Sequence, residues 1–207
     1  MNKIKSEQIL NILKEVIENP RCELNYRNPF ELLIATILSA QTKDSRVNLV
    51  TEKLFFLYPD PVSLANSDIE NVKLIIKPLG LFENKAKNII SVSKDIVEKF
   101  NGTIPDTLEG LMSLNGVGRK TASVILVEGF KIPAVPVDTH VLRVSKRLGY
   151  TKSDNPLEVE KDLKRYIPKE EWMISHHLFI HFGRYICLSR NPHCDSCRLK
   201  EFCKKKG

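Results

Sequence analysis

Apolar residues recur along most of this chain every three or four positions, which is the spacing of one face of an α-helix. The first such stretch predicts a helix over about residues 6–18. A second stretch follows Asn28-Pro29-Phe30-Glu31, whose asparagine is suited to cap a helix, whose proline suits its first position, and whose Glu31 suits a capping box. Residues 32–38 are apolar nearly all round, so we expect this helix to be central and buried.

The helical pattern continues along the chain with short interruptions. Asp44 is placed to cap the next helix, which Pro59-Asp60-Pro61 ends. Two prolines make residues 132–137 extended. The sequence contains no convincing strand pattern and no internal repeat, so the fold is predicted to be all-α, with roughly ten short helices. Further helices are predicted to begin at Ser67-Asp68, Asn84, Pro105-Asp106-Thr107, Arg119 and Asp138-Thr139, and two more to cover about residues 156–167 and 169–185.

A short turn separates two of these helices at Leu114-Asn115-Gly116-Val117-Gly118-Arg119-Lys120. Gly116 and Gly118 permit positive φ and leave backbone N–H groups uncovered at the start of the next helix, where an anion is stabilised. Leu114 and Val117 are expected to turn inward and fix the turn. The pattern predicts a helix–hairpin–helix that grips a phosphate without reading sequence, although Gly-x-Gly between helices is also common as a plain cap and turn.

The composition is that of a globular, basic protein. Of its 207 residues 42% are hydrophobic, which is ample for the core of one large or two small domains. A formal net charge of +7 and a pI of about 9.1 indicate a polyanionic partner, with a merely solvated lysine-rich surface as the alternative. The N-terminal residues run directly into an amphipathic helix, and the longest apolar run is too short to cross a bilayer. We therefore expect a cytoplasmic protein that does not bind a membrane. The helix that begins at Asp138 is expected to carry basic side chains on its outer face: Arg143, Lys146 and Arg147.

Four cysteines, Cys187, Cys194, Cys197 and Cys203, follow the spacing Cys-x6-Cys-x2-Cys-x5-Cys. In a reducing compartment, so dense a set of thiols predicts a metal site rather than disulfides. A zinc ion and an iron–sulfur cluster both accept four thiolates, and the spacing leaves that choice open. The fifth cysteine, Cys22, stands apart and is expected to be a buried core residue. Basic side chains that the loop could present to phosphates surround the ligands: Arg184, Arg190, His193, Arg198, Lys200, Lys204, Lys205 and Lys206.

The hairpin, the segment Val137-Asp138-Thr139-His140-Val141 and the four-cysteine tail occur in this order. Together they closely resemble the endonuclease III family of the helix–hairpin–helix DNA glycosylase superfamily, over nearly all of the chain. The resemblance implies a six-helix domain at residues 22–132, and a second domain made of residues 1–21 and 133–207 that holds a [4Fe-4S] cluster. It also implies base excision repair of duplex DNA containing damaged bases or abasic sites, with removal of oxidised pyrimidines and nicking of the strand. We further expect a monomer.

By the resemblance, Lys120 is the nucleophile. Its neutral amine would attack C1′ of the sugar, form a Schiff base and permit β-elimination of the 3′ phosphate. A helix N-terminus and partial desolvation would favour the neutral amine. Asp138 is expected to stabilise positive charge on the sugar and to assist proton transfers, although an ordinary helix cap would also explain an aspartate there.

Two further residues match positions that enter the duplex when a base is flipped out of it. These are Gln41, in Leu38-Ser39-Ala40-Gln41-Thr42, and Leu81, which follows Gly80. Without the resemblance, a loop glutamine and a stray exposed leucine would describe them equally well. Further DNA contacts are expected at Gly116, Val117, Gly118, Arg119, Thr121, His140 and Arg190.

Three alternatives remain at this point. Adenine-removing mismatch glycosylases share the cluster but lack a lysine at the position of Lys120. A non-catalytic DNA-binding module with a structural or redox-sensing metal would not turn over an abasic duplex. A zinc-binding RNA protein would lack the yellow-brown colour of a [4Fe-4S] protein.

Overall fold

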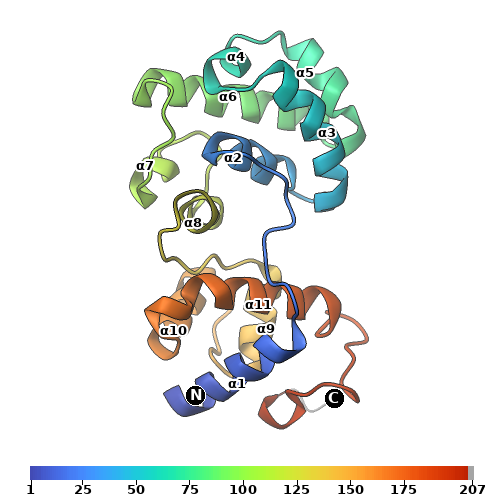
Figure 1. The fold of residues 1–207 in the computed structure, drawn as a ribbon, viewed down its shortest axis with the longest axis vertical. Helices are drawn as coiled ribbons and strands as arrows, with labels where there is room; N and C mark the ends of the chain where they lie inside the picture. The colour runs from blue at the N-terminus through green and yellow to red at the C-terminus, as the bar shows by residue number, and fades with distance from the viewer. Residues whose placement is uncertain (205–207) are drawn as a thin grey trace. The chain divides into compact units, whose positions relative to one another are not determined.

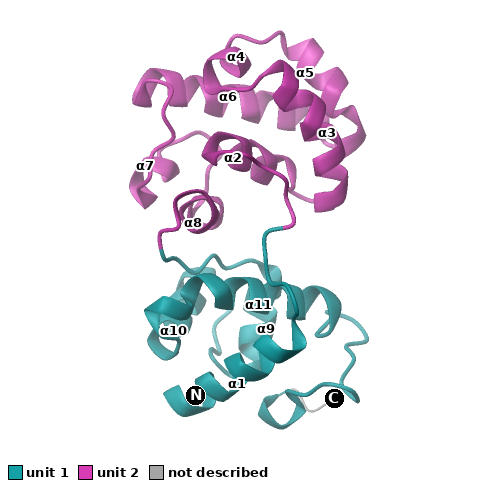
Figure 2. Ribbon diagram, in the orientation of Figure 1, with its two compact units in different colours: residues 1–22, 133–207 teal, residues 23–132 magenta. Residues whose placement is uncertain are grey.

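The computed structural model describes residues 1–204, in which all regular elements are helices and no strand occurs. This confirms the predicted all-α fold. The chain divides into two compact units, unit 1 from Met1–Cys22 with Pro133–Gly207 and unit 2 from Glu23–Ile132 (Figure 2). Cys22 thus lies in unit 1, not in the six-helix domain predicted from residue 22. Within residues 1–204, no helix combines the length and the apolarity that crossing a bilayer requires.

Unit 2 is built around α2 (Pro29–Leu38), which packs against α3, α6, α8 and η2 (Figure 1). Eight of its ten residues are buried, as the apolar run predicted. Its neighbours in chain order are α3 (Asp44–Leu57), α4 (Pro61–Ala65), α5 (Ile69–Ile76), η1 (Lys77–Leu79), α6 (Phe82–Phe100), α7 (Leu108–Met112), α8 (Arg119–Val124) and η2 (Ile125–Gly129).

The caps of unit 2 agree only in part with the sequence predictions. The Asn28 side chain accepts a hydrogen bond from the Glu31 N–H at 2.9 Å, which confirms the predicted cap. Glu31 does not complete a capping box: its buried carboxylate accepts from the Arg27 N–H and guanidinium instead. Asp44 is the first residue of α3 rather than its cap, because the chain is still extended at Lys43.

Unit 1 has α11 (Trp172–Tyr185) at its centre, packed against α1 (Lys3–Val16) and α9 (Thr139–Leu148). Helix α1 begins earlier than predicted because Asn2 caps it by accepting from the Lys5 N–H. The remaining elements are α10 (Pro156–Tyr166), η3 (Lys169–Glu171) and η4 (Lys200–Phe202).

A glycine sets the close approach of α9 to α11. A Cβ atom at Gly183 would lie 2.9 Å from the Cβ of His140 and 3.2 Å from a methyl carbon of Val144. Tyr150 belongs to the same core, and its hydroxyl lies 2.9 Å from Ser6 Oγ on α1. Contacts between residues far apart in sequence therefore hold α1, α9 and α11 together.

Candidate functional site

The predicted hairpin links α7 to α8. Leu114 and Val117 are 2% and 6% exposed, which confirms that both turn inward. Gly116 has a φ of +75°, but Gly118 is extended with a φ of −85° and is the N-cap residue of α8. A Cβ atom at either glycine would meet nothing within 4 Å. The turn therefore presents bare backbone to open space on its outer side.

Helix α6 braces this turn from its polar face. Asp95 Oδ2 accepts a 2.6 Å hydrogen bond from the Asn115 N–H, and Ser91 Oγ accepts one of 3.0 Å from the Asn115 side chain. Lys99 donates to the Ser113 carbonyl at 3.1 Å and pairs with Asp95. Burial of Asp95 acts to raise the pKa of its carboxyl, but the hydrogen bonds from Lys99 and Asn115 and the charge of Lys99 outweigh it, so the pKa is lowered.

Lys120 lies in the first turn of α8 and is exposed. The partial desolvation predicted for its amine is therefore not provided by the folded chain. Arg119 and Thr121 beside it are half-buried. An exposed lysine that follows a turn of uncovered backbone is accessible to a large ligand.

Gln41 and Leu81 both lie in exposed loops of unit 2, and both adopt left-handed backbone conformations. Their φ values are +56° and +49°, and Leu81 is 59% exposed. Leu81 also follows Gly80, whose φ is +67°, so two successive residues have positive φ there. Left-handed φ is unfavourable for residues with a Cβ and is concentrated at functional sites.

A lysine that the sequence analysis did not single out joins these two loops. Lys85, on α6, is 5% exposed, and its ammonium donates to Thr42 Oγ1 at 2.6 Å and to the Leu79 carbonyl at 3.3 Å. Thr42 in turn donates to the Leu79 carbonyl at 2.9 Å. Burial lowers the pKa of Lys85. The one available signal was its position, four residues before Ile89 on the apolar stripe of α6.

Asp138 and His140 open α9 in unit 1. Asp138 accepts a 2.7 Å hydrogen bond from the Val141 N–H, which confirms that it caps the helix. His140 Nδ1 lies 3.2 Å from the Arg143 guanidinium. Burial lowers the pKa of His140; the charge of Asp138 opposes this effect, whereas Arg143 and Arg184 reinforce it. Lys120 and Asp138 belong to different units.

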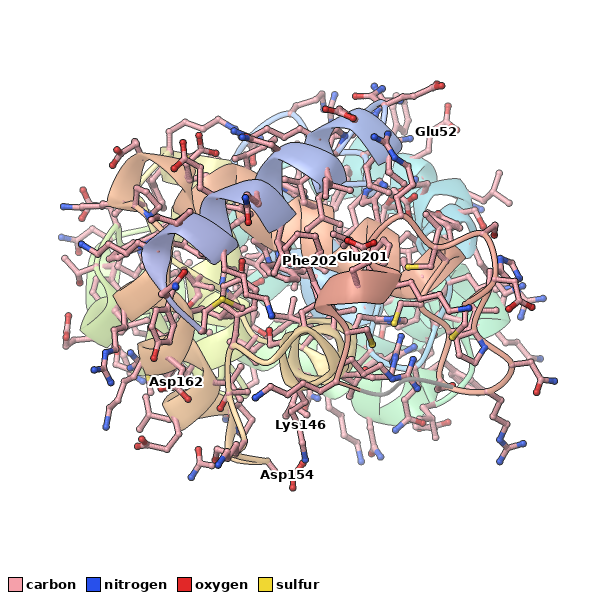
Figure 3. The ribbon with its side chains drawn as sticks, turned by 90° about the horizontal axis from the view of Figure 1, so that it is seen from below. Glu52, Lys146, Asp154, Asp162, Glu201 and Phe202 are labelled. Atoms are coloured by element: carbon pink, nitrogen blue, oxygen red, sulfur yellow. The ribbon has the colours of Figure 1, made fainter. Side chains whose placement is uncertain are left out.

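The four cysteines of the tail line one cavity in unit 1, with apolar walls from Leu148, Phe182, Ile186 and Leu199. Sulfur atoms lie beside η4, where Glu201 and Phe202 are labelled (Figure 3). Within residues 1–204, no disulfide joins any of the five cysteines. Burial raises the pKa of Cys197; the Leu199 N–H opposes this effect, and the other three thiols of the set reinforce it. A positive centre among the four sulfurs would stabilise them as thiolates.

Two arginines of α9 point toward the segment Gly183–Ser189 rather than outward, which corrects the prediction for them, and Arg147 also lines the cavity. Arg147 donates to Cys187 Sγ at 3.2 Å and to the Leu188 carbonyl at 2.7 Å. Arg143 donates to the Cys187 carbonyl at 3.1 Å and to the Gly183 carbonyl at 2.8 Å. Lys146 does face outward and pairs with Asp154 (Figure 3).

Some of the other basic residues of the tail form ion pairs within the protein. Arg198 pairs with Glu15 at 2.6 Å and Lys200 with Asp195 at 3.5 Å, whereas Arg190 is exposed. Lys205 and Lys206 lie outside the described residues. No three His, Cys, Asp or Glu side chains within residues 1–204 are arranged to hold a single metal ion. Cys22 is half-buried, so it is less covered than the predicted core position.

Comparison with known protein families defines the class to which this chain belongs. Residues 34–169 match the HhH-GPD superfamily of base excision DNA repair proteins, and the chain belongs to this superfamily. Several relatives that match it along nearly the whole length are endonuclease III proteins. Endonuclease III of Bacillus subtilis is 45% identical, and the match covers 99% of this chain and 94% of that protein. Endonuclease III of Haemophilus influenzae is 44% identical, and the match covers 100% of this chain and 98% of that protein.

The fold is also shared with a solved structure that contains DNA. A trapped covalent intermediate between endonuclease III and DNA superposes with a TM-score of 0.94. It is 45% identical in sequence, and the match covers 100% of this chain and 97% of that one.

Proposed function

We propose that this protein is a DNA glycosylase with AP lyase activity, which removes oxidised pyrimidines from duplex DNA and then nicks the strand. The observation that carries the proposal is the exposed Lys120, one residue after the start of α8, in a fold shared with a trapped endonuclease III–DNA covalent intermediate. An exposed lysine at the end of a bare backbone turn is accessible to the sugar of a nucleotide that has left the base stack.

Lys120 is the nucleophile of the proposed reaction. The lone pair of its neutral amine forms a bond to C1′ while the bond from C1′ to the base breaks, and the departing base takes up a proton. Ring opening gives a Schiff base. Loss of a proton from C2′ then expels the 3′ phosphate by β-elimination, which breaks the strand. The bound DNA would supply the desolvation that the exposed amine lacks.

Asp138 is proposed to act on the same sugar. Its carboxylate would stabilise positive charge that develops as the base departs, and would assist the proton transfers. Its hydrogen bond to the Val141 N–H fixes its position at the start of α9. Capping and catalysis are compatible, because one carboxylate oxygen remains for a second partner.

The grip on DNA is proposed to be sequence-independent. The backbone at Gly116–Gly118 would bind a phosphate, with Arg119, Thr121, His140 and Arg190 as further contacts. Gln41 and Leu81 would enter the space that the flipped nucleotide leaves. Their exposure and their left-handed backbones support this role.

A [4Fe-4S] cluster is proposed for the cysteine cavity. The fit rests on four thiols that line one cavity with apolar walls and on an arginine N–H donated to Cys187 Sγ. Cys187, Cys194, Cys197 and Cys203 would hold the cluster, which would supply a fixed loop rather than a step of the reaction. A zinc ion is the alternative, and the visible absorption of the purified protein distinguishes the two.

Borohydride trapping tests the catalytic proposal. The duplex carries one oxidised pyrimidine, and the protein is compared with Lys120→Gln. A reduced covalent adduct that requires Lys120 supports the Schiff base. Base release without an adduct would indicate a glycosylase that uses water, and neither product on any lesion would leave a DNA-binding module. We also propose a monomer that works on the nucleoid in the cytoplasm.

A further inference from the structure

Lys85 is an unusual residue for the interior of unit 2. The residue is 5% exposed, and its ammonium donates hydrogen bonds to two oxygens, the Thr42 hydroxyl and the Leu79 carbonyl. Among residues 1–204 no carboxylate pairs with it, and burial is the sole influence that lowers its pKa. Burying an ammonium without a counter-ion lowers the stability of the folded state, and a methionine would fill the same space without that cost. Its presence therefore calls for a role beyond packing.

The position of the ammonium indicates what that role is. Thr42 directly follows Gln41, and Leu79 precedes Leu81 by two residues. The Lys85 backbone N–H also donates to the Leu81 carbonyl at 3.1 Å. One residue of α6 thus holds both loops, and the hydrogen bond from Thr42 to Leu79 closes the connection between them.

Both loops need such support because their backbones are strained. Gln41 and Leu81 have side chains, yet their φ values are +56° and +49°. Left-handed residues of this kind persist where surrounding contacts fix them. The hydrogen bonds of Lys85 fall within two residues of each strained position, on the buried side of loops whose tips are exposed.

We propose that Lys85 is a positioning residue that couples the two loops, so that Gln41 and Leu81 enter the duplex together when a base is flipped. The proposal rests on the proposed function, because it assigns Lys85 a part in base extrusion. It predicts that Lys85 matters most where a stacked base must be removed. It matters less at an abasic site, where the stack is already interrupted.

The experiment compares two single-turnover reactions of the full-length protein. Lys85→Met is expected to slow excision of thymine glycol from a duplex about 10-fold to 100-fold, because small errors of position have effects of that size. Borohydride trapping on a preformed abasic duplex should change less than about threefold, since the chemistry of Lys120 is intact. Lys87→Met is the matched control, because Lys87 is an exposed lysine of the same helix, and it should behave as the wild type in both reactions.

Three further measurements separate coupling from general stability. Thr42→Val removes the shared hydroxyl and should reproduce the selective loss, whereas Thr42→Ser should retain activity. In a Gln41→Ala, Leu81→Ala background, Lys85→Met should have no further effect on excision, because coupled residues are not additive. Amide hydrogen exchange in the DNA-free protein should become faster at residues 40–43 and 79–82 in Lys85→Met.

An unchanged excision rate in Lys85→Met, or equal losses of excision and trapping, would overturn the proposal. If Lys85→Met does not fold, Thr42→Val decides by the same criteria. If the wild-type protein neither excises thymine glycol nor forms an adduct, the proposed function fails. Hydrogen exchange then still decides whether Lys85 restrains the loops. Faster exchange at both loops in Lys85→Met supports the restraint, and unchanged exchange refutes it.

Discussion

Arg147 of α9 donates a hydrogen bond to Cys187 Sγ over 3.2 Å. The same guanidinium reaches the carbonyls of Cys187, Leu188 and Ser189, so it holds the chain through the first proposed ligand of the cluster. The Lys204 N–H in turn donates to the Arg147 carbonyl at 2.7 Å. One residue therefore connects both ends of the cysteine loop to a stable helix of unit 1.

Arg147→Lys is expected to lower the amount of iron that the purified protein retains. A lysine keeps the charge but loses the planar set of donors that reaches three carbonyls and a sulfur. Iron per protein and the visible absorption should both fall, and unit 1 should lose about 1–3 kcal/mol of stability. Lys146→Met is the control, because Lys146 faces outward and pairs with Asp154. Equal iron content in Arg147→Lys and the wild type would contradict this prediction.

The two hairpin glycines should respond differently to alanine. Gly118 is extended with open space around it, so Gly118→Ala should leave thermal stability nearly unchanged. It should nevertheless weaken binding to an abasic duplex, because the new methyl group occupies the space proposed for a phosphate. Gly116→Ala should also cost about 1–2 kcal/mol of stability, since its φ of +75° is unfavourable for alanine. Thermal unfolding and DNA titration check both variants, and normal binding by Gly118→Ala would argue against a phosphate at this turn.

Asp138→Asn should separate capping from catalysis. The asparagine oxygen still accepts from the Val141 N–H, and asparagine caps as well as aspartate, so the melting temperature should hardly change. Loss of the negative charge should slow single-turnover excision by about 100-fold or more. Asp138→Ala serves as the comparison, because it should lose the cap as well, at about 1 kcal/mol. A wild-type rate in Asp138→Asn would leave Asp138 as a cap alone.

The elements of this fold could be predicted from the sequence because their signals are local. The Asn28 and Asp138 side chains each accept from an N–H three residues further along the chain, and the hairpin motif occupies only residues 114–120. Helices such as α2 follow from apolar spacing within one turn or two. These local signals also locate the hairpin, the cysteine tail and the helix that begins after Asp138.

What the sequence did not predict depends on partners far along the chain. Lys85 meets Thr42 across 43 positions, and Arg147 meets Cys187 across 40. In both cases the sequence analysis considered only the helix that carries the basic side chain. Arg147 was therefore assigned to an outer face, and Lys85 was not singled out. The direction of a long polar side chain is decided by which oxygen lies within reach, and only tertiary packing determines that.

Tyr150 makes the stability of unit 1 sensitive to alkaline pH. Its side chain is buried beside Ser6, and burial raises its pKa to about 12 although the hydrogen bond with the Ser6 side chain acts in the opposite direction. The pKa of a tyrosine in an unfolded chain is about 10. The folded protein therefore holds the proton more firmly, and this contribution to stability is complete below about pH 10 and is lost as the pH rises through about 12.

Tyr150→Phe should remove this pH dependence. The wild type should lose up to about 3 kcal/mol from this one group between those two pH values. The variant should be less stable at neutral pH, by about 1 kcal/mol for the lost hydrogen bond, but its stability should decline less steeply in alkali. Denaturant unfolding at a series of pH values between about 9 and 12 measures the difference, with Tyr58→Phe in unit 2 as the control. Parallel curves for Tyr150→Phe and the wild type would show that the buried phenol does not govern the alkaline loss.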